Sequence, residues 1–375
     1  MQRYSDESMV RTFVMGDPQA PFAKVLEVLD WHRALAGDRL AADVVLVSIG
    51  DHFDYDLKNP TAAAQEGLDL LRWLASHDRD QVTLLFGNHD ASRVMELAHF
   101  SDEQFEAARK LARSIDETEH QAGDAAAKQR TREEWLPVFP ELPPPGVVGR
   151  DYASFTTEQR ALVQQLLLAG RFHLACTGEL PDGRTVLITH AGITTRELGL
   201  LGRDATIQPH AIAAALEAQM HAAVDAVRAD WQAGKTASLS LEPLHVTGGN
   251  GEEGGGLLYH RPSNPDKPDA DKAWSLSPTR PRRFDPRTLP VGVTQVAGHS
   301  GHAKCVHELG PWVAESAKER KHGGIRTLRV EGEHVIYDMG IAPPAEDVAD
   351  LILIDGELRR VPATEVALLP LARLL

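Results

Sequence analysis

Cysteine and long apolar runs are scarce in this sequence. Only Cys176 and Cys305 occur among 375 residues, and one bridge at most could form in a chain far too long to depend on it. No apolar run reaches the roughly 18 residues of a membrane-spanning helix. The first residues lack the basic stretch and apolar run of a signal peptide. We therefore expect a cytoplasmic protein with no membrane partner.

Basic residues are outnumbered by acidic ones. The chain has 39 Lys and Arg against 54 Asp and Glu, which gives a formal net charge of −15. An acidic surface repels phosphate backbones at long range, so nucleic acid is disfavoured as the main partner, although a local basic pocket stays compatible with this charge. With 42% hydrophobic residues and no evident linker or fixed repeat, we expect a single domain over residues 1–375.

Five short apolar runs are each followed at once by polar side chains. The runs end at Met15, Ile49, Phe86, Ile188 and Ala297. Short runs rich in β-branched residues that stop at glycine are typical of buried strands. The stretches 24–36 and 62–77 carry apolar residues every three or four positions, as amphipathic helices do. Because open α/β sheets bind ligands at the carboxyl ends of their strands, the polar residues after these runs are the candidate site.

Two long segments interrupt this pattern. Residues 91–172 are mostly helical in pattern, and residues 203–290 begin as an alanine-rich helix and continue as a loop rich in Gly and Pro. Segments that long are usually functional or disordered, and we interpret both as cap insertions. The C-terminal tail alternates as strands and predicts two hairpins, one turning at Gly332 and one at Gly356.

The polar residues at the strand ends share one kind of chemistry. They are Asp17, Gln19, Asp51, His52, Asp54, Asn88, His89, Asp90, His190, His299 and His302. Carboxylate, imidazole and amide groups are ligands for hard or borderline divalent metals. Two metals held close together need a shared anionic bridge, which one Asp can supply. The set contains no thiolate, which excludes a structural zinc site of the finger type.

In their order along the chain, these blocks resemble a known family. The sequence reads GD-x-x, GD-x-x-D, GNHD, HAG and GH, which is similar to the calcineurin-like metallophosphoesterase superfamily. The resemblance implies an α/β fold, a four-layer αββα sandwich of two mixed β-sheets with helical cap insertions. It also implies a phosphoesterase that hydrolyses phosphate esters or anhydrides by a metal-activated water. Its cofactors would be two divalent metal ions, with Mn the first candidate and Fe, Mg and Zn as alternatives.

The resemblance also implies roles for individual residues. The implied metal ligands are Asp17, Gln19, Asp51, Asn88, His190, His299 and His302. Among them, Asp51 resembles the carboxylate that bridges both metals. His89 resembles the outer-sphere acid that contacts the phosphate or the leaving oxygen, and Asp54 the carboxylate that orients it. Asp90 is expected to cap a helix or support a ligand, and His52 to have no role in the site.

Two departures from the family pattern affect the first metal. The first block usually reads D-x-H, but this chain has Gln19, whose amide oxygen is a weaker ligand than imidazole. The first metal is therefore expected to be Mn or Mg, to be held loosely, or to be missing until substrate arrives. Many members end in GH-x-H, whereas here the second histidine, His302, comes one residue later, after Gly301. His302 ligates the metal if the loop bends at Gly301, and otherwise it is a bystander.

Two further stretches narrow the resemblance. "THAGI" (189–193) and "GGLLYHRP" (255–262) resemble the bacterial diadenosine tetraphosphatase and phosphoprotein phosphatase branch. Arg261 then matches an arginine that grips phosphate, which a guanidinium can do with two hydrogen bonds. That branch usually has a second arginine directly after the GD-x-x-D block, but this chain has Tyr55 at that position. Arg93 is a candidate to bind phosphate in its place. The implied partner is a small phosphorylated substrate or a phosphoprotein. The alternative, motivated by Gln19 and Tyr55, is a non-catalytic nucleotide- or partner-binding module on the same fold.

Overall fold

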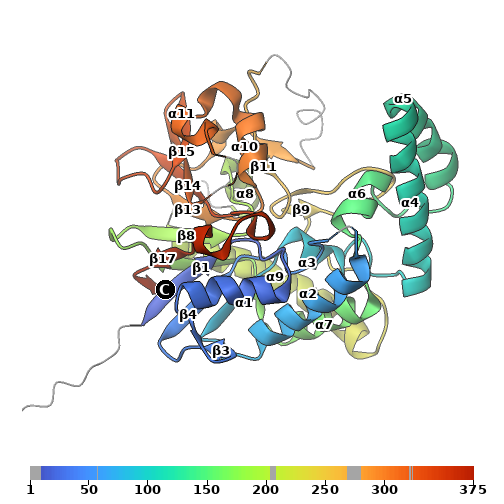
Figure 1. Ribbon diagram of the computed structural model, residues 1–375, viewed down its shortest axis with the longest axis horizontal. Coiled ribbons are helices and arrows are strands. Elements are labelled where there is room, and N and C mark those ends of the chain that lie inside the picture. Colours follow the sequence, from blue (N-terminus) through green and yellow to red (C-terminus); the bar gives the residue numbers. More distant parts are fainter. Residues whose placement is uncertain (1–9, 57, 203–207, 268–279, 321, 323) are drawn as a thin grey trace, which may run out of the picture.

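Two β-sheets organise the molecule (Figure 1). The computed structural model describes residues 10–56, 58–202, 208–267, 280–320, 322 and 324–375. The five-stranded sheet has the order β17-β1-β4-β5-β6, and the seven-stranded sheet the order β15-β14-β16-β13-β8-β7-β18. Both sheets are mixed, because each combines parallel and antiparallel pairs.

All five predicted strands are present. The first sheet contains β1 (Arg11–Met15), β4 (Val44–Ser48), β5 (Val82–Leu85), β6 (Phe172–His173) and β17 (Leu369–Leu371). The second contains β7 (Ala175–Glu179), β8 (Thr185–Thr189), β13 (Thr294–Ala297), β14 (Arg326–Glu331), β15 (His334–Met339), β16 (Ala349–Leu353) and β18 (Arg373–Leu374). Short two-residue strands are β2 (Leu35–Ala36), β3 (Arg39–Leu40), β9 (His245–Val246), β10 (Gly255–Gly256), β11 (Arg261–Pro262) and β12 (Arg283–Phe284).

The strands that precede the polar residues run parallel within each sheet. β1, β4 and β5 form one parallel set, and β8, β13 and β16 form the other. Apolar residues of both sheets, among them Val47 of β4 and Ile188 of β8, pack into one buried cluster between them. The mixed α/β class is therefore confirmed, and the finer four-layer arrangement stays a prediction.

Helices α1 (Phe22–Trp31), α2 (Pro60–Ala75), α7 (Thr157–Leu168) and α9 (Pro209–Gln232) share the main apolar core. α2 begins where the side chain of Asn59 accepts a hydrogen bond from the Ala62 N–H group and Pro60 occupies the first turn. α1 ends at Trp31, earlier than the predicted 36, because Leu35 and Ala36 pair as β2. Helices α8 (Thr195–Leu200), α10 (His302–Leu309) and α11 (Glu315–Lys318) are shorter, and α10 and α11 pack on the second sheet.

A separate helical lobe, which we call the cap, stands to one side of the sheets at the right of Figure 1. It contains α4 (Asp102–Ala122), α5 (Asp124–Arg130), a π-helical turn at Thr131–Trp135 and α6 (Pro145–Asp151). Its apolar side chains form their own buried cluster around Trp135. Two helices of the predicted insertions, α7 and α9, pack in the main core and not in this lobe. Residues 203–207 and 268–279 of the second insertion lie outside the described residues.

The tail contains one of the two predicted hairpins. β14 and β15 pair around Gly332, as expected. The second hairpin, at Gly356, is wrong: the chain continues from β16 into a short 3-10 turn at Leu358–Arg360, and Leu358 is buried in the main core. This path carries Asp355 and Glu357 to the strand ends instead of back along the sheet. Among the described helices, none is both long and apolar enough to cross a bilayer.

Candidate metal centre

Loops from both sheets converge at the carboxyl ends of their parallel strands. Asp51, His190 and His299 follow β4, β8 and β13, and one ligand atom from each lies within 4.8 Å of the others. All three side chains are buried. Asp51 and His299 have left-handed backbone, with φ of 60° and 58°, a conformation that costs energy in non-glycine residues and is concentrated at functional sites.

The two imidazoles present free ring nitrogens to this cluster. Since a carbonyl can only accept, the Nδ1–H of His190 donates to the Ile49 carbonyl at 2.9 Å, which leaves Nε2 as an acceptor. This Nε2 lies 3.1 Å from Asn88 Oδ1 and 3.5 Å from Asp51 Oδ1. These three acceptor atoms repel one another, and a cation bound between them would offset that repulsion.

His299 has the matching arrangement with its nitrogens exchanged. Its Nε2–H donates to the Tyr259 carbonyl at 3.0 Å, so Nδ1 is the unprotonated nitrogen. Burial, followed by the charge of Arg261, lowers the pKa of His299 well below its usual value. The imidazole therefore stays neutral at physiological pH, which is the form that binds metals.

Glycines let the carboxylates approach the neighbouring loops closely. A Cβ added to Gly87 would stand 2.3 Å from Asp51 Oδ1, and one added to Gly298 would stand 2.1 Å from Asp17 Oδ1. Neither position could hold a side chain without displacing a carboxylate oxygen. The glycines of the GNHD and GH blocks thus have a steric role, and the donor set that they accommodate fits divalent metals.

Asp17 and Gln19 lie beside this cluster. Both carboxylate oxygens of Asp17 accept from the N–H of His299, at 3.1 and 2.9 Å. Burial, then Asp355 and then Asp51 raise the pKa of Asp17 well above its usual value. The Nε2 of Gln19 donates to the Phe53 carbonyl at 3.3 Å, and the side chain lines the same cavity as Asp17.

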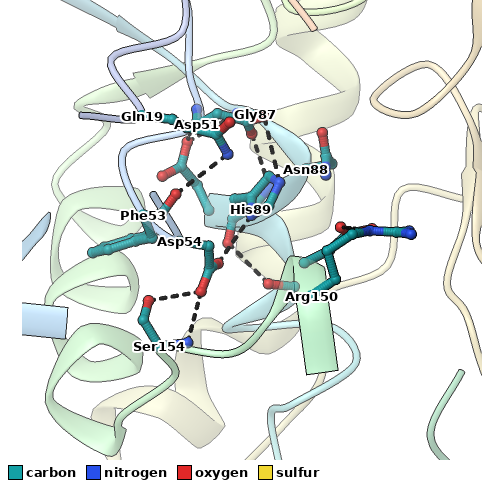
Figure 2. A network of polar contacts seen from close by, with 12 residues as sticks. Gln19, Asp51, Phe53, Asp54, Gly87, Asn88, His89, Arg150 and Ser154 are labelled. Atoms are coloured by element: carbon teal, nitrogen blue, oxygen red, sulfur yellow. Dashed lines mark hydrogen bonds and ion pairs between the residues drawn. The ribbon is translucent and has the colours of Figure 1, made fainter. Parts of the chain in front are cut away.

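His89 is held between two carboxylates (Figure 2). Its Nδ1–H donates to Asp54 Oδ2 at 2.9 Å, and Nε2 lies 3.8 Å from Asp51 Oδ2. Burial lowers the pKa of His89, but Asp51 and Asp54 outweigh it and raise the value to about 9. The N–H and hydroxyl of Ser154 donate to Asp54 Oδ1 at 2.8 and 2.6 Å, which fixes the carboxylate from below.

Arg93 does not occupy the substrate-binding position proposed for it. The side chain is fully buried, and its Nη1 lies 2.7 Å from Asp54 Oδ2. Its other donors bond Gln159 and Ser154. Arg93 caps the C-terminal end of α3 (Asn88–Ser92), one helical turn after His89. Its side chain therefore lies on the same face of the helix as His89 and is directed into the protein interior. It supports Asp54, and the prediction that it grips phosphate is wrong.

The ring of His302 bonds groups outside the cluster of ligand atoms. Its Nδ1 accepts from the Tyr337 hydroxyl at 2.8 Å, and its Nε2–H donates to the Ala317 carbonyl at 3.0 Å. Both ring nitrogens are therefore engaged away from Asp17. His302 is the first residue of α10, and the helix turns its side chain toward α11. Of the two alternatives left open, these contacts favour the bystander.

Asp90 has the supporting role expected of it. Its carboxylate accepts from the N–H groups of Gly87, Asp51 and His52, at 3.0, 3.0 and 3.3 Å. It also bonds the His52 ring at 3.0 Å. Asp90 thus joins the two turns that carry Asp51 and Asn88, and no oxygen of it is directed at the cluster of ligand atoms.

The site opens into a cavity of about 290 Å³. Several of its lining residues were not anticipated from the sequence: Arg150, Asp151, Asp355, Glu357, Arg359 and Arg360. Asp355 follows the buried run "LILI", the same signal that located the other strand ends. It was not selected because the segment around Gly356 was interpreted as a hairpin turn. The predicted Arg261 does line this cavity, and its guanidinium lies over the Tyr259 ring, with Cζ 5.4 Å from the ring centroid.

Comparison with known proteins gives one finding. The family model of the calcineurin-like phosphoesterases matches residues 10–207, which is more than half of the chain. The matched segment contains Asp17, Asp51, Asn88 and His190, while His299 and Asp355 lie beyond it. No curated protein matches the chain, and no solved structure matches it.

Proposed function

This chain belongs to the calcineurin-like phosphoesterase family, and we propose that it hydrolyses phosphate esters or anhydrides with two divalent metal ions at the strand ends. The observation that carries the proposal is the convergence of Asp51, His190 and His299 from three strands and both sheets. When bound, the metals would supply an activated water and neutralise charge on the phosphoryl group. Mn is the first candidate, with Fe, Mg and Zn as alternatives.

The chain offers two sets of ligands that share Asp51. Asn88, His190 and His299 would complete one set, which we call the mixed half-site because it combines nitrogen and oxygen donors. Asp17 and Gln19 belong to the other set, which we call the oxygen half-site. Mixed nitrogen and oxygen donors suit borderline metals, whereas oxygen donors alone suit harder ones.

His89 would act as the general acid. Its Nδ1 is held by Asp54, so Nε2 is the nitrogen that would give a proton to the leaving oxygen. Arg93 and Ser154 fix Asp54 in turn, which supports a single orientation of the ring. His89 lines the cavity together with Arg261, so both would reach a phosphate that entered it. Arg261 would grip non-bridging phosphate oxygens.

The substrate class follows from the finer resemblance. We place the chain near the bacterial diadenosine tetraphosphatase and phosphoprotein phosphatase branch, on the strength of the blocks around His190 and Arg261. A small phosphorylated compound and a phosphoprotein both remain candidates. Four arginines (Arg150, Arg261, Arg359 and Arg360) line the cavity together with five carboxylates, and Arg150 and Arg360 pair with Asp151 and Glu357. An anionic substrate would therefore depend on Arg261 and on the bound metal ions.

The test is an assay of chelator-treated protein with and without added Mn²⁺. The panel contains p-nitrophenyl phosphate, bis-p-nitrophenyl phosphate, diadenosine tetraphosphate and a phosphopeptide. We expect no turnover after chelation and recovery with Mn²⁺ on at least one substrate. Failure to bind metal together with no turnover on the whole panel would favour the non-catalytic binding module.

A further inference from the structure

The oxygen half-site lacks two imidazoles that the family pattern leads one to expect. Gln19 stands where the D-x-H block has its histidine, and Gly301 stands where GH-x-H has its second one. His302, the nearest histidine in sequence, is engaged with Tyr337 and Ala317. If nothing replaced these groups, Asp17, Gln19 and the shared Asp51 would have to hold a metal alone.

Asp355 reaches the space that a side chain at position 301 would fill. A Cβ added to Gly301 would stand 3.3 Å from Asp355 Oδ2. A Cβ added to Gly16 would stand 3.2 Å from the Asp355 Cα. The backbone segments around Gly16 and Asp355 are therefore in contact, next to Asp17. Asp355 and Asp17 line the same cavity. The carboxylate therefore lies between the loop of His299 and the loop of Asp17.

The fold holds Asp355 in this position. β16 runs parallel to β13, so its carboxyl end meets the same edge of the sheet. The buried Arg326 donates to the carbonyls of Leu353 and Asp355, at 3.3 and 2.7 Å. Oδ1 of Asp355 accepts from the Glu357 N–H at 3.0 Å, while no described residue donates a hydrogen bond to Oδ2. One oxygen is thus anchored and the other is left facing Gly301.

We propose that Asp355 ligates the metal of the oxygen half-site, in place of the imidazole absent at position 301. This inference rests on the proposed function. Asp17, Asp51 and Asp355 are three carboxylates whose mutual repulsion a cation would offset. The half-site would then be built from oxygen donors alone, which favours Mg²⁺ or Mn²⁺ over the Zn²⁺ and Fe²⁺ that imidazoles attract.

The first experiment counts metal ions. Wild type, Asp355→Ala and Asp350→Ala are loaded with Mn²⁺, desalted and analysed for manganese per chain, and titrated by calorimetry. Asp350 lies at the other end of β16, is buried, and pairs with Arg184 and Arg329, so it is a matched carboxylate on the same strand. We expect Asp355→Ala to lose one of two equivalents, or to bind it at least about tenfold more weakly. Asp350→Ala should keep both, although it unfolds at a lower temperature.

The second experiment restores the absent imidazole. Gly301 has φ −62° and ψ 152°, an extended conformation that any residue adopts, so histidine fits the backbone there. In Asp355→Ala the carboxylate that a Cβ would meet is also removed. The double variant Gly301→His/Asp355→Ala should regain the lost equivalent of Mn²⁺ and bind Zn²⁺ more tightly than wild type. A structural role for Asp355 would not produce this rescue.

The outcomes separate this inference from the proposed function. Two tightly held equivalents in Asp355→Ala, with Mn²⁺-dependent turnover intact, would overturn the role of Asp355 and leave the phosphoesterase assignment standing. No metal and no turnover in wild type would overturn both. If Asp355→Ala does not fold, as judged by circular dichroism, Asp355→Asn carries the test, since it keeps the shape and removes the charge.

Discussion

The two half-sites of the candidate centre differ in the atoms that they offer and in where those atoms come from. The mixed half-site takes Asn88, His190 and His299 from blocks that follow the family pattern. The oxygen half-site has Gln19 in place of one histidine of the family pattern. In place of the other it has Gly301, which has no side chain and lies next to Asp355. If the proposed ligands hold, one half-site keeps the ligands of the family pattern and the other is completed from a separate strand, β16.

Asp51→Asn is expected to have the largest effect, because this residue is common to both half-sites. Turnover should fall at least about a thousandfold, which corresponds to roughly 4 kcal/mol of lost transition-state stabilisation. The measurement is kcat/KM on p-nitrophenyl phosphate with saturating Mn²⁺, alongside a thermal unfolding curve. A folded variant that keeps wild-type turnover would show that the half-sites do not share Asp51.

His89→Ala should remove chemistry while leaving both half-sites filled. Loss of a general acid costs about a hundredfold to ten-thousandfold in rate. The loss should be larger for an alkyl phosphate than for p-nitrophenyl phosphate, because an alkoxide needs protonation more than a nitrophenolate does. Manganese content per chain should not change. An equal loss on both substrates would contradict the assignment of His89 as the acid.

Arg93→Met tests the support beneath His89. Removing one partner of a buried ion pair leaves Asp54 without its cation and should lower the free energy of unfolding by about 3–5 kcal/mol. The control is Arg72→Ala, which breaks the exposed pair with Glu158 and should cost about 1 kcal/mol or less. Urea unfolding followed by circular dichroism measures both, and equal costs would contradict the structural role of Arg93.

The same variant has a pH signature. Burial raises the pKa of Asp54, but Arg93 and His89 outweigh burial and hold this pKa well below its usual value. A carboxyl with a depressed folded pKa contributes stability above its unfolded pKa of about 4, and this contribution disappears as pH falls through the folded value. The difference in unfolding free energy between wild type and Arg93→Met should therefore shrink as pH falls below about 4.

His190→Ala and His302→Ala sharpen the comparison between two buried histidines. His190→Ala should weaken binding of one metal, preferentially Zn²⁺, by about tenfold to a hundredfold and leave the oxygen half-site occupied. His302→Ala should leave metal content unchanged and cost about 1–3 kcal/mol of stability, because the Ala317 carbonyl and Tyr337 hydroxyl lose their partner. Calorimetric titration with Zn²⁺ and Mg²⁺ distinguishes them.

The sequence was most informative where a buried strand ends in a polar residue. Such a strand needs apolar side chains on both faces, so its limits can be read from hydrophobicity, and the turn after it supplies the site. That signal marked Asp17, Asp51, Asn88, His190 and His299 as candidates, and the structure brings ligand atoms of Asp51, His190 and His299 within 4.8 Å of one another. It also marked Asp355, but a glycine between two apolar runs was interpreted as a hairpin turn.

Two differences from the expectation concern the direction of side chains. Arg93 is four residues after His89, and only the helical backbone between them shows that it lies under the histidine. His302 is two residues from Ser300, yet a new helix begins there and turns it away. The extent of the cap could not be predicted either, because a helical pattern does not show which apolar cluster a helix packs against: α9 packs in the main core and α4 in the cap.

Ser154 ties the cap to the centre of the molecule. It lies just after α6, between Tyr152 and Phe155 of the cap's own apolar cluster, yet its N–H and hydroxyl both bond Asp54. Lifting the cap would therefore take two hydrogen-bond donors from the group that aligns His89. The position of this edge of the cap and the orientation of His89 are therefore coupled through one carboxylate.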